Sequence, residues 1–416
     1  MLFNSLEFIV FFPIVVALYF MLPHRFRWML LLVASYYFCM CWNYKYVVLL
    51  IFATLVSYYS AIGIYKAQRI WMKKSLLIIS LISVLSTLFF FKYFNFFGDA
   101  LNQLFSNWNI FYRIPTYHFL LPIGISFYTF QVVSYIIDVY RDTTKPTYHL
   151  GHYALFVSFF PKLIAGPIDR AQNLLPQFST KIEVDYARIR DGLFLMLWGF
   201  FKKIVIAERV AEYVNLVYDH PTEYQGPHFL IATLFYTVQI YCDFSGYTDI
   251  ARGTAKILGY DILQNFRRPY LATTIRDFWQ RWHITLSTWF RDYVFFPSSF
   301  SLSYKITKNK ILFIKKDVII YIAATIITWF LTGLWHGANW TFLIWGGLFG
   351  FYLIVANQTK SFRKKFNKSI GLTKRPVLLL FISILTTNIL VSFNWIFFRA
   401  NSLQDALFII GKMTKL

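Results

Sequence analysis

Hydrophobic residues fall in long stretches along the whole chain, and short polar segments separate these stretches. A helix needs about 20 consecutive apolar residues to cross the hydrocarbon core of a bilayer. Several stretches meet or approach that length, so the pattern predicts a polytopic membrane protein. The apolar stretches are residues 6–22, 47–65, 75–91, 118–140, 317–335, 340–356 and 377–398.

The middle of the chain follows a different pattern. Between about residues 140 and 317 the apolar runs are shorter, and Pro, Gly and charged residues interrupt them. Irregular backbone is tolerated at membrane depth only where protein covers it or water fills a cavity. We therefore expect re-entrant segments and a polar interior in this region. No repeat and no long polar stretch divides the chain, which favours one membrane domain over residues 1–416.

Composition and charge fit the same class of protein. Only 14% of the residues are charged, and 57% are hydrophobic. The formal net charge of +22 could indicate nucleic-acid binding, but the basic residues gather in short loops between apolar stretches, as in membrane proteins with cytoplasmic positive loops. The basic segments 305–316 and 360–375 are therefore expected in the cytoplasm. Because Arg25 and Arg27 follow the first stretch, we interpret it as a retained helix and not as a signal peptide.

Residues 276–293 repeat with a helical period. Trp279, Trp282 and Trp289 share one face, and the polar residues share the other. Asp277 and Arg281 have the spacing of an ion pair along a helix. The segment is predicted to be a helix, and an aromatic belt at the membrane interface would account for the pattern by itself.

His336 stands between two apolar stretches, at residues 317–335 and 340–356. Both outer flanks of this helical hairpin are lysine-rich, so the turn with His336 is expected on the opposite side of the membrane. The first stretch reaches about 28 Å as a helix, which is about one membrane thickness.

His336 is either a hydrogen-bonded turn residue or a catalytic base. Acyl transfer to an alcohol needs a group that takes the hydroxyl proton, and imidazole suits that task.

His283 is the second candidate. It lies on the polar face of residues 276–293, where Arg281 and Ser287 could bind an anionic acyl donor or polarise its carbonyl. It could equally be an ordinary residue of that face.

Asp243 and Asp249 follow the apolar run at residues 229–241. Buried acids must be paired or hydrogen-bonded, so these carboxylates either form ion pairs or orient a histidine or a sugar. Three arginines are available as partners: Arg252, Arg267 and Arg268.

Other chemistries lack their usual motifs. The chain has no Gly-x-Ser-x-Gly elbow, no Walker loop, no dinucleotide fingerprint and no His-Glu-x-x-His zinc motif. The three cysteines are an odd number, and Cys39 and Cys41 lie within one apolar run, which argues against disulfides. We expect no metal and no bound cofactor.

Short motifs recur in order along the chain: MLFNS (1–5), LPIGISF (121–127), DVYR (138–141), FFPKLIAGPI (159–168), DFSGYTD (243–249), FWQRWH (278–283) and LWHG (334–337). In these motifs and their spacing the chain resembles the membrane-bound O-acyltransferases, and specifically their alginate O-acetyltransferase branch. Two departures stand out. Residues 297–300 read Pro-Ser-Ser-Phe where that branch commonly has Pro-Leu-Gly-Gly, and relatives often carry more helices beyond Arg399.

The resemblance implies an all-α fold with about nine to twelve membrane helices around a central tunnel. It implies that His336 is catalytic and that His283 is the second important position. The donor would be a cytoplasmic acyl thioester such as acetyl-CoA, and the acceptor a cell-surface or secreted polysaccharide outside a bacterial cell membrane. A separate extracytoplasmic acetyltransferase could receive the acetyl group. The expected substrate-binding residues are Arg281, Trp282, Trp335, Asn339, Asp243, Ser245, Tyr247 and Asp249.

Two other functions remain open at this point. A transporter or flippase that moves a lipid or polymer without bond chemistry would also use broken helices and buried charge. A transferase of D-alanine or of fatty-acyl groups to teichoic acid, protein or lipid would share the motifs, because pocket size cannot be read from a sequence.

Overall fold

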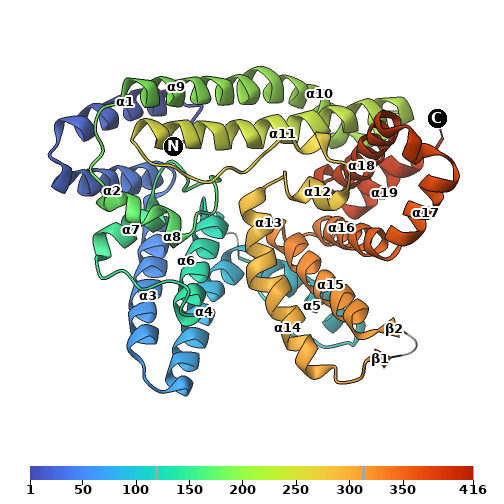
Figure 1. The fold of residues 1–416 in the computed structure, drawn as a ribbon, viewed down its shortest axis with the longest axis horizontal. Helices are drawn as coiled ribbons and strands as arrows, with labels where there is room; N and C mark the ends of the chain where they lie inside the picture. The colour runs from blue at the N-terminus through green and yellow to red at the C-terminus, as the bar shows by residue number, and fades with distance from the viewer. Residues whose placement is uncertain (118–119, 312–313, 416) are drawn as a thin grey trace. The chain divides into compact units, whose positions relative to one another are not determined.

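The computed structural model describes residues 1–117, 120–311 and 314–415, and nearly all regular structure in them is helical (Figure 1). The chain divides into two compact units, residues 1–204 with 244–263 and residues 205–243 with 264–416. Helix α11 (Gly226–Ile257) contributes to both. The single membrane domain over residues 1–416 stays a prediction.

The first unit contains the helices of the N-terminal half. They are α1 (Leu6–Met21), α2 (His24–Met40), η1 (Tyr44–Tyr46), α3 (Val47–Lys66), α4 (Ile70–Lys92), α5 (Phe94–Asn107), α6 (Ile125–Tyr140), α7 (Leu150–Ser158), α8 (Ala171–Leu174), η2 (Pro176–Ser179) and α9 (Tyr186–Phe200). A π-helical stretch, η3 (Phe201–Ala207), continues α9.

The second unit contains the C-terminal helices and one small hairpin. Its elements are α10 (Glu208–Asp219), η4 (Pro221–Glu223), η5 (Pro269–Leu271), α12 (Ile275–Trp279), α13 (Ile284–Phe290), η6 (Arg291–Phe295), α14 (Phe296–Lys305), β1 (Lys310–Ile311), β2 (Ile314–Lys315), α15 (Lys316–His336), α16 (Trp340–Gln358), α17 (Lys360–Ser369), η7 (Leu372–Lys374), α18 (Pro376–Arg399) and α19 (Leu403–Met413).

Five helical segments in the described part of the chain are long and apolar enough to cross a membrane: Tyr44–Lys66, α4, α15, α16 and α18. Helix α1 is apolar but shorter. These segments match six of the predicted stretches, so the prediction of an all-α polytopic membrane protein is confirmed.

The seventh predicted stretch, residues 118–140, begins at two residues outside the described part, and its helix α6 begins at Ile125. Residues 312 and 313 of the lysine-rich segment 305–316 also lie outside it. The count of nine to twelve helices, the re-entrant segments and the tunnel stay predictions.

Helix α9 and the part of α11 that belongs to the first unit, residues 244–257, run side by side with their backbones in contact (Figure 1). A Cβ atom on Gly199 would lie 2.7 Å from the carbonyl oxygen of Gly246, and one on Gly253 would lie 2.5 Å from that of Gly192. Small residues at a helix crossing allow this close approach, which strengthens dispersion contacts between membrane helices. Four glycines therefore set the spacing of this helix pair.

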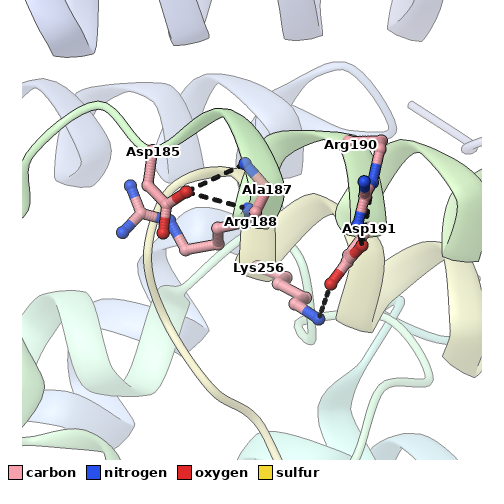
Figure 2. Close-up of polar contacts among 6 residues, drawn as sticks. All are labelled: Asp185, Ala187, Arg188, Arg190, Asp191 and Lys256. Carbon is pink, nitrogen blue, oxygen red and sulfur yellow. Dashed lines mark hydrogen bonds and ion pairs between the residues drawn. The ribbon is translucent and has the colours of Figure 1, made fainter.

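Polar groups at one end of α9 support the same pair (Figure 2). The carboxylate of Asp185 accepts hydrogen bonds from the backbone N–H groups of Ala187 (2.9 Å) and Arg188 (3.3 Å), which begins the helix. Lys256 of α11 lies 3.4 Å from the carboxylate of Asp191 on α9. Since Lys256 and Asp191 are both partly exposed to solvent, the ion pair adds little energy, and the glycine contacts dominate.

In the first unit, two of the sequence motifs meet at a glycine. Gly124 of the LPIGISF motif has φ +74°, and a Cβ atom there would lie 2.3 Å from the carbonyl oxygen of Leu163 in the FFPKLIAGPI motif. Any larger residue would be strained by its backbone conformation and would also strike that carbonyl. In the same unit the ring of Phe3, from the opening motif, lies 4.8 Å from that of Tyr247.

The α15–α16 hairpin of the second unit is closed by two glycines. A Cβ atom on Gly333 would lie 2.4 Å from the carbonyl oxygen of Phe342, and one on Gly346 would lie 2.4 Å from that of Trp329. Both contacts are with backbone, which cannot move aside as a side chain does. The glycines thus fix the two helices at close range directly beside the turn that follows His336.

One expectation for the middle of the chain was wrong. Residues 276–293 do not form one helix, because α12 ends at Trp279 and α13 begins at Ile284, with η6 following it. Helix α11 extends past the apolar run at residues 229–241 and continues unbroken through Asp243 and Asp249 to Ile257. The helical period of the aromatic face persists across the first break, which is why periodicity alone did not reveal it.

Candidate active site

His336 is the last residue of α15 and lies within an aromatic enclosure. Its imidazole centroid is 4.7 Å from that of Trp345 on α16 and 5.1 Å from that of Phe398 on α18, with interplanar angles of 75° in both cases. Edge-to-face packing of this kind holds a ring in one orientation. The His336 residue is half-buried, and its Nε2 atom lies on the buried side of the ring.

Trp335 connects His336 to the second predicted histidine. Its ring lies 4.8 Å from that of His336 and 6.1 Å from that of His283. Trp335 itself is 7% exposed. The fold therefore brings both histidines, from distant parts of the sequence, to a single buried indole.

Asn265 holds the ring of His283 from the other side. The Asn265 Oδ1 atom is 3.3 Å from His283 Nδ1, and it also accepts hydrogen bonds from the backbone N–H (3.1 Å) and hydroxyl (2.7 Å) of Thr285. The two Thr285 donors require an oxygen at this position, so the amide orientation is set by the network. An amide oxygen cannot donate, so the His283 contact makes Nδ1 the protonated nitrogen and leaves the lone pair of the neutral ring on Nε2.

The backbone at His283 explains why the predicted helix is broken. His283 has φ 41° and ψ 55°, a left-handed conformation that costs a non-glycine residue about 1–3 kcal/mol. Two backbone hydrogen bonds hold it there: Ile284 N–H donates to Asn265 O (2.9 Å), and Arg267 N–H donates to Arg281 O (2.9 Å). Such strain is often found at functional sites, where the surrounding structure maintains it.

Burial also affects the chemistry of His283, which lies outside the five candidate spans. The side chain is 1% exposed. Because burial disfavours the charged form, the pKa of His283 is lowered from its ordinary value. The ring is therefore neutral near pH 7, with Nε2 able to accept a hydrogen bond.

A pocket of about 720 Å³ lies in the same unit, between α12, α13, η6 and one face of α15. The α15 face carries Thr325, Thr328 and Thr332, which follow at helical spacing and are continued one turn later by His336. Three arginines from other parts of the unit add positive charge to the lining: Arg267, Arg276 and Arg291. The pocket thus combines positive charge with a threonine-bearing face of α15, and neither histidine is among its lining residues.

The remaining predicted residues of the second unit make contacts with other residues of the protein. Arg281 Nε lies 2.7 Å from Asp277 Oδ1, which confirms the predicted ion pair. Trp282 is 3% exposed and packs 5.1 Å from Trp395, in the aromatic core. Asn339 accepts a hydrogen bond from the backbone N–H of Thr341 at the start of α16, and its Nδ2 donates to the carbonyl of Asn401. Substrate contacts by Arg281, Trp282 and Asn339 stay predictions.

Two residues of the DFSGYTD motif contact a buried lysine from another helix. Lys202 Nζ lies 2.6 Å from Asp249 Oδ2 and 2.9 Å from Ser245 Oγ, and the lysine is only 6% exposed. Arg252 lies 3.9 Å from the same carboxylate, which confirms one of the three predicted partners. Asp243 is exposed on α11. Ser245 and Asp249 belong to the first unit with Tyr247, whereas both histidines belong to the second, and substrate roles for these motif residues stay predictions.

Sequence reasoning missed three features of these sites. The pairing of Lys202 with Asp249 could have been found, because a lysine inside an apolar run needs an acidic partner. Asn265 could not, since nothing in its local sequence marks an amide that bonds a histidine 18 residues away. The pocket arginines belong to separate elements that only folding brings together.

Comparison with known proteins gives the same family as the motifs. The chain matches the profile of the membrane-bound O-acyltransferase family over residues 141–370, which include both histidines. It is 36% identical to the probable alginate O-acetylase of Pseudomonas aeruginosa over 412 residues, 98% of this chain and 73% of the relative. It is 35% identical to the peptidoglycan O-acetyltransferase of Helicobacter pylori, over 93% of this chain and 73% of the relative. Identity to the teichoic acid D-alanyltransferase of Bacillus subtilis is 30%, over 61% of this chain and 62% of the relative.

Proposed function

The chain belongs to the membrane-bound O-acyltransferase family, and we propose that it transfers or relays an acetyl group from a cytoplasmic thioester to a polysaccharide outside a bacterial cell membrane. The protein is a membrane acyltransferase, and its O-acetyltransferase relatives support acetyl as the group that is moved. Family membership favours bond chemistry over a transporter or flippase that makes no bonds.

The observation that carries the proposal is the convergence of His336 and His283 on Trp335. In the proposed step, an alcohol oxygen attacks the carbonyl carbon of the acyl thioester while His336 takes the hydroxyl proton. The carbon–sulfur bond then breaks, and the proton passes to the departing thiolate. The products are the ester and the free thiol, so no covalent enzyme intermediate is needed. If a partner enzyme completes the reaction, its nucleophile takes the place of the alcohol.

His283 has a supporting role in this proposal. Its neutral ring offers the Nε2 lone pair, while Asn265 fixes the other nitrogen at 3.3 Å. Nε2 would accept a hydrogen bond from a second hydroxyl of the acceptor and so hold the attacking oxygen in line with the carbonyl. Orientation of this kind accounts for a large part of enzymatic rate enhancement.

The pocket beside α15 suits the donor. The guanidinium groups of Arg267, Arg276 and Arg291 match the phosphates of a donor such as acetyl-CoA, since arginine binds phosphate through paired N–H groups. The threonine face would then guide the thioester arm towards His336. A volume of about 720 Å³ is within the range of small-molecule sites.

The test is incorporation of labelled acetyl from acetyl-CoA into polymer, in membranes that contain the protein. His336→Ala should abolish incorporation while membrane insertion is retained. His228→Ala, which changes an exposed histidine of the same unit, is the matched control and should behave like the unmodified protein. Transfer by His336→Ala at the unmodified rate would refute the catalytic assignment.

Similarity to the Bacillus subtilis teichoic acid D-alanyltransferase supports a second candidate, D-alanyl transfer. It covers less of the chain than the similarity to the O-acetyltransferases, which is why we rank it second. A parallel assay with labelled D-alanine, supplied as its carrier thioester, separates the two. Label from D-alanine and none from acetyl would reverse the ranking.

A further inference from the structure

Helix α17 (Lys360–Ser369) is held at the membrane surface by its neighbours in the chain. It follows α16 and precedes α18, which are both long and apolar enough to span a membrane. Only the short turn η7 separates it from α18, and η7 packs against both helices. A ten-residue helix between two spanning helices must lie close to the lipid head groups.

One side of α17 is apolar and uncovered. Phe362, Phe366 and Ile370 follow at intervals of four residues and are 68%, 51% and 56% exposed. The two phenyl rings stack at 6.2 Å with an interplanar angle of 16°. A continuous apolar stripe on an otherwise polar helix is typical of helices that lie in the plane of a membrane interface.

The rest of α17 is strongly basic. It contains no acidic residue, and among the residues that the structure describes none of its lysines has an acidic partner. Arg363 has a structural role, because it bonds the Thr359 hydroxyl (3.2 Å) and the Ala356 carbonyl at the end of α16. Four positive charges therefore face outwards: Lys360, Lys364, Lys365 and Lys368.

The beginning of α18 adds a second feature at the same end of the helices. An open hollow of about 560 Å³ is lined by one cation and a set of apolar side chains. Its lining residues are Arg375, Pro376, Val377, Leu378 and Phe381. A charged group above an apolar surface matches the order of a phospholipid, whose phosphate lies above its acyl chains.

We propose that α17 and the start of α18 bind anionic glycerophospholipid, with the lysines and Arg375 on the phosphates and the Phe362, Phe366 and Ile370 stripe among the upper acyl chains. An acidic protein would satisfy the lysines, but it would leave the exposed phenyl rings and the hollow of Arg375 without an apolar partner. Each lysine near an anionic membrane surface contributes favourable electrostatic energy, and the stripe adds apolar burial. This binding is independent of the acyl-transfer proposal.

The experiment is native mass spectrometry of the purified full chain in detergent, titrated with phosphatidylglycerol or with phosphatidylcholine of the same acyl chains. The unmodified protein should prefer phosphatidylglycerol. Lys364→Gln with Lys365→Gln should weaken phosphatidylglycerol binding by about 30-fold, from loss of two surface charges. The control, Lys308→Gln with Lys310→Gln, removes two exposed lysines from another basic loop and should keep the preference.

Three results would overturn the proposal. One is equal binding of the two lipids by the unmodified protein. Another is an α17 variant that binds phosphatidylglycerol as the unmodified protein does. The third is an equal loss in the control variant, which would mean that only total charge matters. Phe362→Ser with Phe366→Ser separates the contribution of the apolar stripe from that of the charge, because it should weaken binding of both lipids. This variant and Lys364→Gln with Lys365→Gln should both keep the thermal unfolding midpoint of the unmodified protein.

Discussion

The indole ring of Trp335 lies 6.1 Å from the imidazole of His283, with the two ring planes inclined by 65°. Trp335 is also the residue directly before His336, whose ring is 4.8 Å from the same indole. One buried side chain thereby sets the separation of the two histidines. The relationship makes Trp335 part of the framework of the site, whether or not it also touches a substrate.

Replacement of Trp335 should therefore impair acetyl transfer, although Trp335 takes no part in the proposed chemical step. Trp335→Phe keeps an aromatic surface but removes half of the bicyclic ring, so we expect both histidines to lose their fixed positions and acetyl incorporation to fall by about tenfold or more. The measurement is the rate of labelled acetyl transfer in proteoliposomes. Trp340→Phe, at a 58% exposed position of the same hairpin, should leave the rate unchanged. Equal rates in Trp335→Phe and the unmodified protein would contradict the framework role.

Asn265 should control the pH dependence of transfer. In Asn265→Asp, a carboxylate beside Nδ1–H stabilises the imidazolium form and raises the lowered pKa of His283. Because the proposed role needs a neutral ring, activity should then be lost at a higher pH, and the acidic limb of the pH profile should move upwards. Asn265→Leu lacks any acceptor and should reduce kcat by about 10- to 100-fold, the usual effect of removing an orienting partner. An acidic limb at the same pH in Asn265→Asp and the unmodified protein would count against the assignment.

The arginines of the pocket should recognise the phosphates of the donor and not its acyl group. Arg276→Gln should raise KM for acetyl-CoA by about tenfold, since a charge-assisted hydrogen bond contributes about 1.5–3 kcal/mol. KM for acetyl-pantetheine, which lacks phosphate, should not change. Arg209→Gln, at an exposed arginine that pairs with Glu212, is the control. The same change in KM for both donors would show that Arg276 does not read phosphate.

Two adjacent glycines give a matched test of the α15–α16 hairpin. A Cβ atom on Gly346 would lie 2.4 Å from the Trp329 carbonyl, whereas one on Gly347 would meet nothing within 4 Å. Gly346→Ala should push the helices apart, lower stability by about 1–3 kcal/mol and displace His336. Gly347→Ala should be neutral or slightly stabilising, because alanine favours helix. Thermal unfolding in detergent measures both, and equal unfolding midpoints for the two variants would contradict the close crossing.

The sequence by itself determined the class of the protein and the identity of its candidate histidines. Apolar stretches predict spanning helices because each helix satisfies its own backbone hydrogen bonds in lipid, so length and composition suffice. The hairpin with His336 at its turn follows from the same local rule, as does the pairing of Asp277 with Arg281. These features depend on residues that are near one another in the chain.

Only the tertiary structure decided how those pieces meet. The aromatic period of residues 276–293 predicted a single helix, yet the hydrogen bonds from Ile284 to Asn265 and from Arg267 to Arg281 accompany a break in it, where His283 has a left-handed conformation. The contact of His283 with Trp335, the Lys202 partner of Asp249 and the arginines of the pocket likewise join residues that are distant in sequence. Periodicity reports which face of a segment is apolar, but the energy that bends a backbone or pairs a buried charge comes from other segments packed against it.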